Sequence, residues 1–334
     1  MAEPISVIIT CFNLERYIGD AIESVLTQDI DVPYELIVVD DASVDGSVEI
    51  ISRFPQARLL KMVANGGVLR ATVLGLRAAS HDIVAFLDGD DRWHPSKLKR
   101  MLSTFAGSPA LGLVTHDLRY VDSDGNALPR RTRPSQVMPK AASNAEYDAL
   151  IRDGILEQGD YVWLGSAYAI RRSVVDAEGF CQFTDGLPDP RNTYQDWPLA
   201  VWCAAQRHVS MGYIPEVLFD YRLHQANHSG DARTVDKATR NVERTLNTLR
   251  AIEDIALRHG PITQRANHAI RRKRMYYEYM LALYSNQRWA ALRGFLSTQG
   301  YVLRGDASAW KEYVRFVAVQ LFGVDGFIRR LNKP

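Results

Sequence analysis

The chain has 334 residues, of which 46% are hydrophobic and 24% charged, with 40 Lys+Arg against 39 Asp+Glu. This length and composition exclude a fibrous or disordered protein and predict a globular one with a sizeable core. No stretch approaches the roughly 20 apolar residues of a membrane-spanning helix, and the first residues lack a signal-peptide pattern, so we expect a cytoplasmic protein.

The first hundred residues alternate short apolar runs with helical patterns. We expect strands at Ile5–Thr10, Glu35–Asp40, Arg58–Lys61 and Asp82–Asp88, with helices over about 15–28, 45–53 and 68–79 and another from Pro95. Continuous apolar strands separated by crossover helices form a parallel sheet that helices cover on both faces. The predicted fold class is therefore α/β, with a mostly parallel central sheet whose carboxyl edge binds ligands.

Beyond about residue 112 the pattern is mixed and then becomes helical. We expect strands at Gly112–His116, Leu164–Ile170 and Tyr213–Tyr221, a helix over Gln195–Ala205, a Pro/Arg-rich loop over 129–140, and helices over Val235–Ala256 and from Pro261. The loop is either a lid over the site or a plain connection. We place a boundary near residue 230, between a first domain (1–230) and a helical C-terminal region (231–334).

The two regions differ in charge. Residues 231–334 hold 19 Lys+Arg and 9 Asp+Glu, whereas residues 1–230 hold 21 and 30. A basic helical tail suits contact with an anionic surface such as lipid headgroups, although solvated helix faces also produce such a balance. An apolar stripe between Tyr313 and Leu331 fits an interfacial membrane helix, a homodimer contact or packing within the chain.

The three cysteines lie far apart in the chain. Cys11, Cys181 and Cys203 form no CxxC pair, which argues against a disulfide framework and against a structural zinc site. We therefore expect three buried free thiols.

Six carboxylates follow the predicted strands at one edge of the sheet. They are Asp40, Asp41, Asp45, Asp88, Asp90 and Asp91. Asp45 has a local alternative as a helix cap. The three like charges after the fourth strand repel one another unless a cation neutralises them. A divalent metal is the economical explanation, since carboxylate and diphosphate oxygens together complete an octahedral site for Mg²⁺ or Mn²⁺.

Two common nucleotide-binding motifs are absent from the sequence. There is no G-x-G-x-x-G after the first strand and no G-x-x-x-x-G-K-[ST] anywhere. Dinucleotide oxidoreduction and P-loop phosphoryl transfer therefore lose their main support.

Five motifs occur in a fixed order: ISVIITCFN at 5–13, ELIVVDDASVDGS at 35–47, Asn65-Gly66-Gly67, IVAFLDGDDRWHP at 83–95 and YRLHQANHS at 221–229. Together they resemble the signatures of family 2 glycosyltransferases, over about residues 4–230. The resemblance implies a GT-A, Rossmann-like fold with a catalytic domain at 1–230. It also implies an inverting, metal-dependent enzyme that uses a nucleotide sugar.

The resemblance implies roles for the matching residues. The expected nucleotide-sugar contacts are Thr10, Asn13, Asp40, Asp41, Asn65, Arg70, Asp88, Gly89, Asp90 and Arg222. Asp90 is the expected direct ligand of Mn²⁺ or Mg²⁺, with His224 beside it and Asp88 nearer the ribose or a metal-bound water. Arg222 has two open roles, which are to neutralise phosphate charge or to pair with an aspartate of the acidic edge.

The expected catalytic base is Asp196, at the position where the family usually has an acidic pair opening a helix. Gln195 replaces the usual Glu of that pair, and a helix cap is the alternative role for Asp196. The acceptor-side candidates are Trp163, Trp197, Gln195 and Asp91. Core packing is the alternative for the aromatic residues, and a turn cap is the alternative for Asp91.

A second departure from the family follows Gly67. About five and six residues beyond this glycine the family often has Arg and then Asn, whereas this chain has Thr72 and Val73. The donor nucleotide is therefore left open between UDP, which the family favours, and dTDP or GDP.

The expected acceptor is a saccharide or lipid-linked glycan of a bacterial surface polysaccharide, at the cytosolic face of the membrane, with no nucleic-acid partner. Two alternatives remain. A sugar nucleotidyltransferase would need a glycine-rich loop after the first strand, which is missing, and a non-catalytic sugar-binding or scaffold protein is favoured by Gln195 alone.

Overall fold

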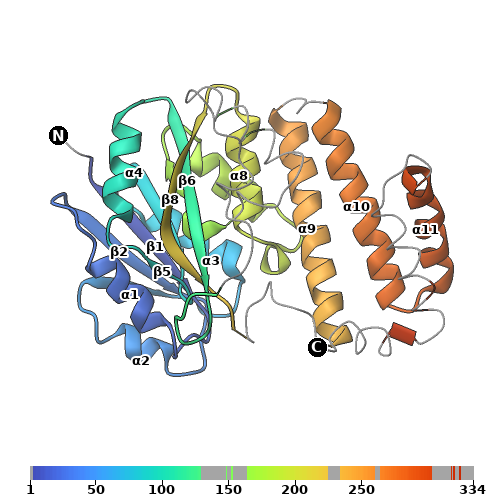
Figure 1. The fold of residues 1–334 in the computed structure, drawn as a ribbon, viewed down its shortest axis with the longest axis horizontal. Coiled ribbons are helices and arrows are strands. Elements are labelled where there is room, and N and C mark those ends of the chain that lie inside the picture. The colour runs from blue at the N-terminus through green and yellow to red at the C-terminus, as the bar shows by residue number, and fades with distance from the viewer. Residues whose placement is uncertain are drawn as a thin grey trace.

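The computed structural model describes residues 3–128, 164–224, 234–259 and 264–302, together with residues 148, 152, 317, 319, 323 and 324. A mixed sheet with the strand order β3-β2-β1-β4-β7-β6-β8-β5 forms its centre. Helices pack on this sheet, and further helices follow it towards the C-terminus (Figure 1). The predicted α/β class is confirmed.

The first four strands form the parallel part of the sheet. They are β1 (Ile5–Cys11), β2 (Tyr34–Asp40), β3 (Ala57–Lys61) and β4 (Ile83–Asp88), each within one residue of its predicted bounds. β1 is buried along its whole length because β2 pairs with it on one side and β4 on the other. The strand order therefore reverses between β1 and β4, and open α/β sheets bind ligands in the crevice at such a reversal.

The helices of this half lie on both faces of the sheet. They are α1 (Ile18–Leu26), α2 (Ser47–Ile51), α3 (Val68–Ala78) and α4 (Lys97–Ala106). α1 packs on β1 and α2, whereas α3 packs on β1 and β2. Because crossovers between parallel strands are right-handed, α3, which returns from β3 to β4, lies on the face opposite to α1 and α2.

The second half of the sheet contains antiparallel pairs. Its elements are β5 (Arg92–Trp93), β6 (Leu111–Val121), β7 (Ala169–Arg171), β8 (Ser210–Arg222), the helices α7 (Ala177–Asp185) and α8 (Asp196–Ala205), and the 3-10 turns η1 (Gly165–Ala167) and η2 (Pro190–Asn192). β7 pairs antiparallel with both β4 and β6.

The strand predicted over Leu164–Ile170 is wrong in its first half, which forms η1. That turn brings the Ser166 hydroxyl to Asp88 and Asp91.

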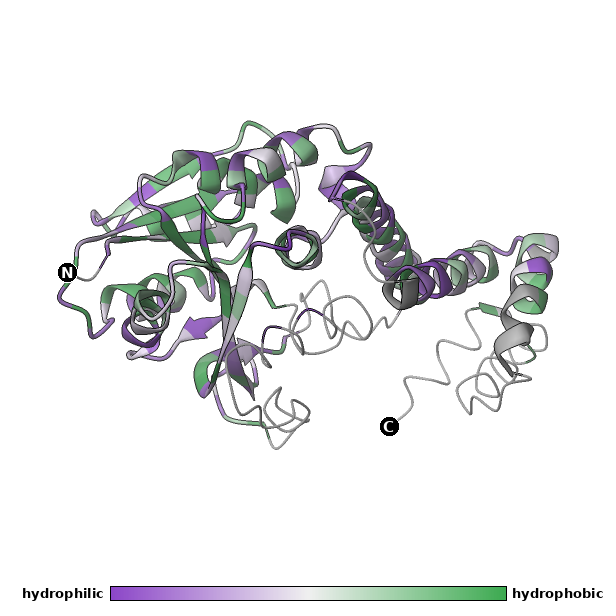
Figure 2. Ribbon diagram, turned by 90° about the horizontal axis from the view of Figure 1, so that it is seen from above, coloured by the Kyte–Doolittle hydropathy of each residue, from purple (hydrophilic) through white to green (hydrophobic). Residues whose placement is uncertain are grey.

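The helices α9 (Val235–His259), α10 (Gln264–Tyr284) and α11 (Arg288–Val302) follow the sheet. Figure 2 shows them extending from the sheet as an arm. α9 joins two apolar clusters, because Leu249 and Ile252 are buried in the core of the sheet, whereas Val242 and Leu246 pack with α10 and α11. The boundary near residue 230 falls outside the described residues and stays a prediction.

The end of the chain is described at a few positions. Val319 is 6% exposed and packs in the cluster of α10 and α11. The rest of the predicted apolar stripe and the loop over 129–140 lie almost wholly outside the described residues. No helix in the described part of the chain is both long enough and apolar enough to cross a membrane.

All three cysteines are free and buried, as predicted. Burial raises the pKa of the Cys11 thiol to about 12 and that of the Cys181 thiol to about 11. Cys203 is buried in α8.

Candidate active site

The loop after β2 is built around the carboxylate of Asp41, which is 3% exposed. It accepts hydrogen bonds from the N–H groups of Gly66 (2.6 Å) and Gly67 (2.8 Å) and from the Asn65 side chain (3.0 Å). Burial raises the pKa of Asp41, and the hydrogen bonds from the backbone of Gly66 and Gly67 oppose that effect. Gly67 has a φ of 83°, and a Cβ there would lie 2.2 Å from the carbonyl oxygen of Arg191. Asp41 thus holds the glycine turn that opens α3.

Asp40 is the other buried carboxylate of this loop, at 2% exposed. Its Oδ2 accepts the N–H of Ser43 (3.2 Å), whereas its Oδ1 has no hydrogen-bond partner among the described residues. A buried oxygen of this kind suits a ligand that brings its own donor.

Asn13 connects the ends of β1 and β2. It has a φ of 54°, donates its N–H to the Ser43 hydroxyl (2.9 Å) and accepts the N–H of Val44 on its side chain (2.9 Å). Thr10, Asn13, Asp40 and Asp41 therefore share one end of the sheet, whereas the Arg70 side chain is exposed on α3.

The loop after β4 starts at Asp88, whose Oδ1 accepts two hydrogen bonds. Thr10 Oγ1 donates at 3.2 Å and Gln195 Nε2 donates at 2.7 Å. Burial, and then the charge of Asp90, raise the pKa of Asp88 to about 6. Gly89 crosses close over β1, where a Cβ would lie 2.8 Å from the carbonyl oxygen of Thr10. Only glycine lets the loop pass there.

Asp90 and His224, the two residues predicted to bind a metal together, are in contact. Asp90 Oδ2 lies 2.9 Å from His224 Nε2, and the His224 side chain is 5% exposed. Neighbouring ligands of an octahedral ion with bonds of about 2.1 Å lie about 3 Å apart, so the two atoms fit one cation. The described residues contain no group of three or more His, Cys, Asp and Glu side chains that suits a metal ion. The remaining ligands would come from a diphosphate or from water.

Asp91 is 1% exposed and is held from two sides. Its carboxylate accepts the Ser166 hydroxyl (2.6 Å) and the N–H of Arg222 (3.0 Å). The same hydroxyl accepts the N–H of Asp88 (3.0 Å). Burial, and then the charges of Asp90 and Asp88, raise the pKa of Asp91 well above its usual range. Asp91 therefore orients the loop and has no exposed surface to offer an acceptor.

Lys97 is fully buried beneath this loop. It donates to the carbonyl of Ser166, and its Nζ lies 4.1 Å from the centroid of the Trp93 ring. Burial lowers the pKa of Lys97 well below its usual range, and Asp91 opposes this effect.

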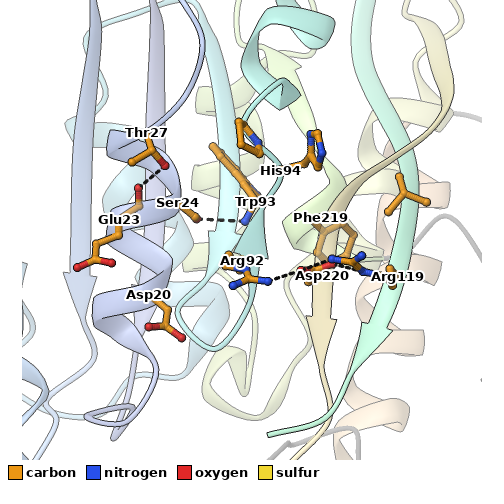
Figure 3. A pocket seen from close by; sticks show the side chains of 12 residues that line it. Asp20, Glu23, Ser24, Thr27, Arg92, Trp93, His94, Arg119, Phe219 and Asp220 are labelled. Atoms are coloured by element: carbon orange, nitrogen blue, oxygen red, sulfur yellow. Dashed lines mark hydrogen bonds and ion pairs between the residues drawn. The ribbon is translucent and has the colours of Figure 1, made fainter. Parts of the chain in front are cut away.

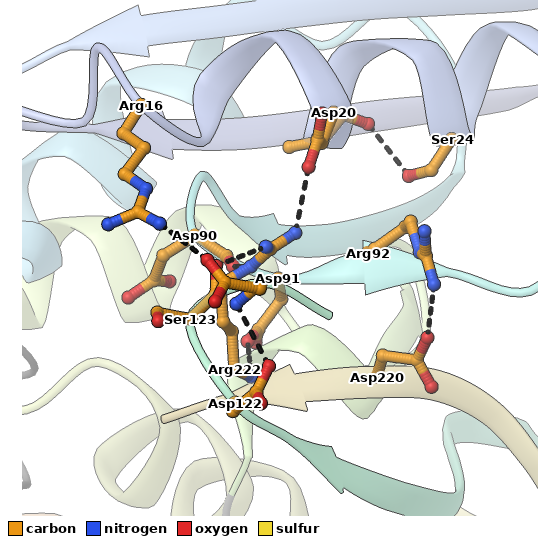
Figure 4. A network of polar contacts seen from close by, with 12 residues as sticks. Arg16, Asp20, Ser24, Asp90, Asp91, Arg92, Asp122, Ser123, Asp220 and Arg222 are labelled. Carbon is orange, nitrogen blue, oxygen red and sulfur yellow. Dashed lines mark hydrogen bonds and ion pairs between the residues drawn. The ribbon is translucent and has the colours of Figure 1, made fainter. Parts of the chain in front are cut away.

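Arg222 is 4% exposed and uses its guanidinium within the protein. Figure 4 shows its bonds to the carbonyls of Asp90 (2.9 Å) and Ser123 (3.0 Å) and to the Asp20 carboxylate (2.9 Å). Of its two predicted roles, the geometry favours pairing with an aspartate over binding phosphate. That aspartate is Asp20 of α1 rather than one of the acidic edge.

Asp196 is the first residue of α8 and is partly exposed. Burial, and then the charge of Asp88, raise the pKa of Asp196 to about 7. A carboxylate with such a pKa is matched to accepting a proton near neutral pH. Gln195, not Asp196, stands at the N-cap position and makes no side-chain cap bond. The Asp196 Oδ1 nevertheless accepts the N–H of Trp197 in the first turn of α8 (2.9 Å), so the base and the cap both stay predicted roles of Asp196.

Of the two tryptophans predicted on the acceptor side, Trp197 is described by the structure and Trp163 is not. Trp197 is partly exposed, and Lys273 of α10 lies with its Nζ 5.2 Å from the centroid of its indole. Trp163 lies outside the described residues.

A cavity of about 540 Å³ lies beside α1, β5 and β8 (Figure 3). Arg92 and Arg119 line it, and both pair with Asp220. None of the predicted site residues is among its lining residues. Asp20 connects it with the Arg222 network.

Three residues that shape the site were not predicted, namely Ser166, Lys97 and Asp20. Each acts through a partner at least 69 residues away in the chain. No local pattern marks such contacts. The one feature visible in the sequence is that Lys97 opens a helix, where a positive charge is unfavourable beside the helix dipole.

The sequence matches the family model described as "Glycosyl transferase family 2" over residues 6–175. A relative in Nostoc sp., an uncharacterized glycosyltransferase, is 38% identical over 128 residues, which are 37% of this chain and 39% of that protein. The chain spans less than two thirds of the curated relatives that it matches first.

Two solved structures share the fold. S. aureus TarS 1-349 in complex with UDP-GlcNAc has a TM-score of 0.57 at 14% identity, covering 90% of this chain and 92% of that one. Mannosyltransferase PcManGT from Pyrobaculum calidifontis, in complex with GDP-Man and Mn²⁺, has a TM-score of 0.54 at 16% identity, covering 99% and 87%. The expected GT-A fold is confirmed, and with a model match over more than half of its length the chain belongs to glycosyltransferase family 2.

Proposed function

We propose that this protein is a metal-dependent inverting glycosyltransferase that moves a sugar from a nucleotide sugar, UDP-linked in preference to dTDP- or GDP-linked, to an acceptor hydroxyl. The observation that carries the proposal is the Gln195–Asp88 hydrogen bond of 2.7 Å. It brings the start of α8, with Asp196, to the loop that contains Asp90. A base with a pKa of about 7 and a cation-binding pair then share one edge of the sheet.

The reaction is a single displacement. Asp196 takes the proton of the acceptor hydroxyl while that oxygen attacks the anomeric carbon of the donor. The bond between this carbon and the diphosphate oxygen breaks, and the nucleoside diphosphate leaves with the electron pair. One backside attack inverts the anomeric configuration, so an α-linked donor gives a β-linked product.

The donor would lie over the ends of β1, β2 and β4. The unpartnered Oδ1 of Asp40 and the Thr10 side chain suit the polar edge of the base and the ribose. Asp90 with His224 would hold Mn²⁺ or Mg²⁺, and Asp88 would stand beside them. The bound cation would neutralise negative charge on the leaving diphosphate.

The proposal also covers the acceptor, the location of the protein and the role of its C-terminal region. We propose that residues 1–230 carry out transfer to a saccharide or lipid-linked glycan of a surface polysaccharide, in the cytoplasm. Residues 231–334 would meet the membrane surface or a second subunit. Removal of residues 308–334 should lower the membrane-bound fraction in cell extracts, and an unchanged fraction would refute membrane contact through this segment.

The donor proposal is tested by thermal unfolding with Mn²⁺ and each of UDP, dTDP and GDP. A nucleotide at a hundred times its Kd should add about 2.7 kcal/mol to the free energy of unfolding, and Asp90→Ala should remove that gain. The matched control is Asp185→Ala, an exposed carboxylate at the end of α7. No stabilisation by any nucleotide would favour the non-catalytic alternative.

The role of Asp196 is tested separately. Asp196→Asn should abolish sugar transfer and leave Mn²⁺-dependent nucleotide binding intact. Transfer at the parent rate would remove Asp196 as the base.

A further inference from the structure

Two buried polar side chains that lie far apart in the sequence, Thr72 and Gln195, are in contact. Thr72 lies on α3 and Gln195 directly precedes α8, 123 residues later, and the Thr72 hydroxyl donates to Oε1 of Gln195. The other end of the same amide donates from Nε2 to Asp88 Oδ1 at 2.7 Å. A chain of hydrogen bonds thus runs from α3 through Gln195 to the loop after β4.

The amide has one orientation that satisfies both neighbours. A carboxylate only accepts hydrogen bonds, so the NH₂ group must face Asp88 and the carbonyl oxygen must face the Thr72 hydroxyl. That hydroxyl also lies 2.9 Å from the carbonyl oxygen of Val68. It therefore shares its proton between two acceptors and keeps a fixed position on α3.

The surroundings leave Gln195 little freedom. Its side chain is enclosed, with Gln195 7% and Thr72 2% exposed. A Cβ at position 165 would lie 2.8 Å from Gln195 Nε2, so the glycine of η1 makes room for the amide. Rotation of the amide away from Asp88 would leave its polar atoms buried without partners, which is costly.

Thr72 and Gln195 are both neutral and both buried. A charge introduced at only one of the two positions would be buried without a partner, a strongly destabilising change.

We propose that Thr72 and Gln195 form a positioning unit that fixes the Asp88 carboxylate and ties the start of α8, with Asp196, to the donor side of the site. The inference rests on the proposed function, which gives Asp88 and Asp196 their roles. Gln195 is then part of a working site and does not mark a lost one. Thr72 acts through Gln195 and touches no substrate.

The first test is a double-mutant cycle with the near-isosteric variants Thr72→Val and Gln195→Met. The dissociation constant of Mn²⁺ is measured by electron paramagnetic resonance in the presence of UDP, and kcat and KM are measured with the donor. Gln195→Met should weaken Mn²⁺ binding about tenfold, because it frees Asp88, which would stand beside the metal-binding pair in the outer shell of the ion. In the Gln195→Met background, Thr72→Val should cause no further change in the Mn²⁺ dissociation constant or in kcat.

Two results would overturn the proposal. One is additive effects of the two variants on the Mn²⁺ dissociation constant. The other is a lowered Tm with unchanged Mn²⁺ affinity and kcat of the folded protein, which is the signature of packing alone. Gln182→Met, an exposed glutamine on α7, is the control and should change neither quantity.

The second test introduces opposite charges at the two positions. Thr72→Arg and Gln195→Glu should each lower kcat/KM by more than tenfold, because each buries one charge without its partner. The double variant should recover to within about threefold of the parent, a coupling of the kind that double-mutant cycles detect between contacting residues. A folded double variant with a kcat/KM no higher than that of the worse single variant would count against a direct contact between the two positions. If the arginine variants fail to fold, the isosteric cycle still decides.

Failure of this inference is distinguishable from failure of the proposed function. If the parent binds no nucleotide with Mn²⁺, the proposed function fails. The contact between Thr72 and Gln195 is then tested by Tm alone. The decreases in Tm caused by Thr72→Val and Gln195→Met should be non-additive in the double variant. Additive decreases would refute the contact. If the parent binds nucleotide but the cycle is additive, the positioning unit fails and the function stands.

Discussion

The two acidic loops at the edge of the sheet look alike in sequence but are stabilised in different ways. In the loop after β2, Asp41 accepts its hydrogen bonds from residues 24 to 26 positions further along the chain, two of them backbone N–H groups. In the loop after β4, the partners of Asp88, Asp90 and Asp91 lie 75 to 134 positions away.

The difference separates a carboxylate that is held close to its own loop from carboxylates that distant segments of the chain bring together. Asp41 is saturated by donors and completes a turn. In contrast, burial and then the charge of Asp90 raise the pKa of Asp88, and burial and then the charge of Asp88 raise the pKa of Asp196. Such like-charged carboxylates are stable together only when a cation or a proton joins them. The loop after β4 is therefore less stable alone and better suited to bind a cation.

The largest stability effect is expected for Asp41→Ala. The buried N–H groups of Gly66 and Gly67 would lose their acceptor, at about 1–3 kcal/mol each, so the free energy of unfolding should fall by about 3–4 kcal/mol. Urea unfolding measures this, with Asp185→Ala as an exposed control. If Asp41→Ala keeps its stability and loses only nucleotide binding, the contrast between the loops is wrong.

A smaller loss is expected for Ser166→Ala in the other loop. The hydroxyl that joins the Asp88 N–H to the Asp91 carboxylate disappears, at about 2 kcal/mol. The gain in Tm from Mn²⁺ with nucleotide should shrink as well, because Asp90 lies between these two residues. Ser103→Ala, on the exposed side of α4, is the control. An unchanged response to the metal would mean that Ser166 supports the fold only.

Asp196→Asn should stabilise the protein at pH 8. The folded state raises the pKa of Asp196 to about 7, so it binds the proton more tightly than the unfolded chain, and stability falls as the pH rises from about 4 to 7. Removing the charge should return about 1–2 kcal/mol at pH 8, after allowance for partial exposure, and less at pH 5. Thermal unfolding at both pH values measures the difference. An equal change in the free energy of unfolding at both pH values would show that burial does not destabilise the charged form of Asp196.

The smallest effect is expected for the exposed ion pair between Arg16 and Asp124. Arg16 lies just before α1, and Asp124 lies in the turn after β6. Both side chains are at least 60% exposed. A double-mutant cycle with Arg16→Ala and Asp124→Ala should give about 0.5 kcal/mol or less. A coupling energy of about 2 kcal/mol, as large as the loss expected for Ser166→Ala, would show that exposed ion pairs also stabilise this end of the sheet.

The parallel half of the sheet was predictable because its signals are local. The buried strands β1, β2 and β4 consist mostly of apolar residues, and β2 and β4 each end at an aspartate at the sheet edge. Right-handed crossovers then place those ends together. The position of Asp90 beside His224 came instead from the ordered motifs of the family.

The turn η1, the contact between Thr72 and Gln195 and the burial of Arg222 could not be predicted, because they depend on contacts between segments far apart in the sequence. Position 166 lies in a run that is typical of a strand, yet the turn η1 prevails because Ser166 satisfies two groups of the distant loop after β4. Thr72 and Gln195 were each recognised as departures, but their 123-residue separation hid the contact. The burial of Arg222 is equally non-local, since its partners come from three separate segments.

The buried cysteines give this protein built-in reporters of its own opening. Cys11 ends β1 beside the site, Cys181 lies in α7 and Cys203 in α8, so the three thiols sample different parts of the molecule. A protonated, enclosed thiol does not react with iodoacetamide until its region opens. The alkylation rates of the three cysteines, compared with and without nucleotide, would therefore map which regions a donor locks, without any introduced label.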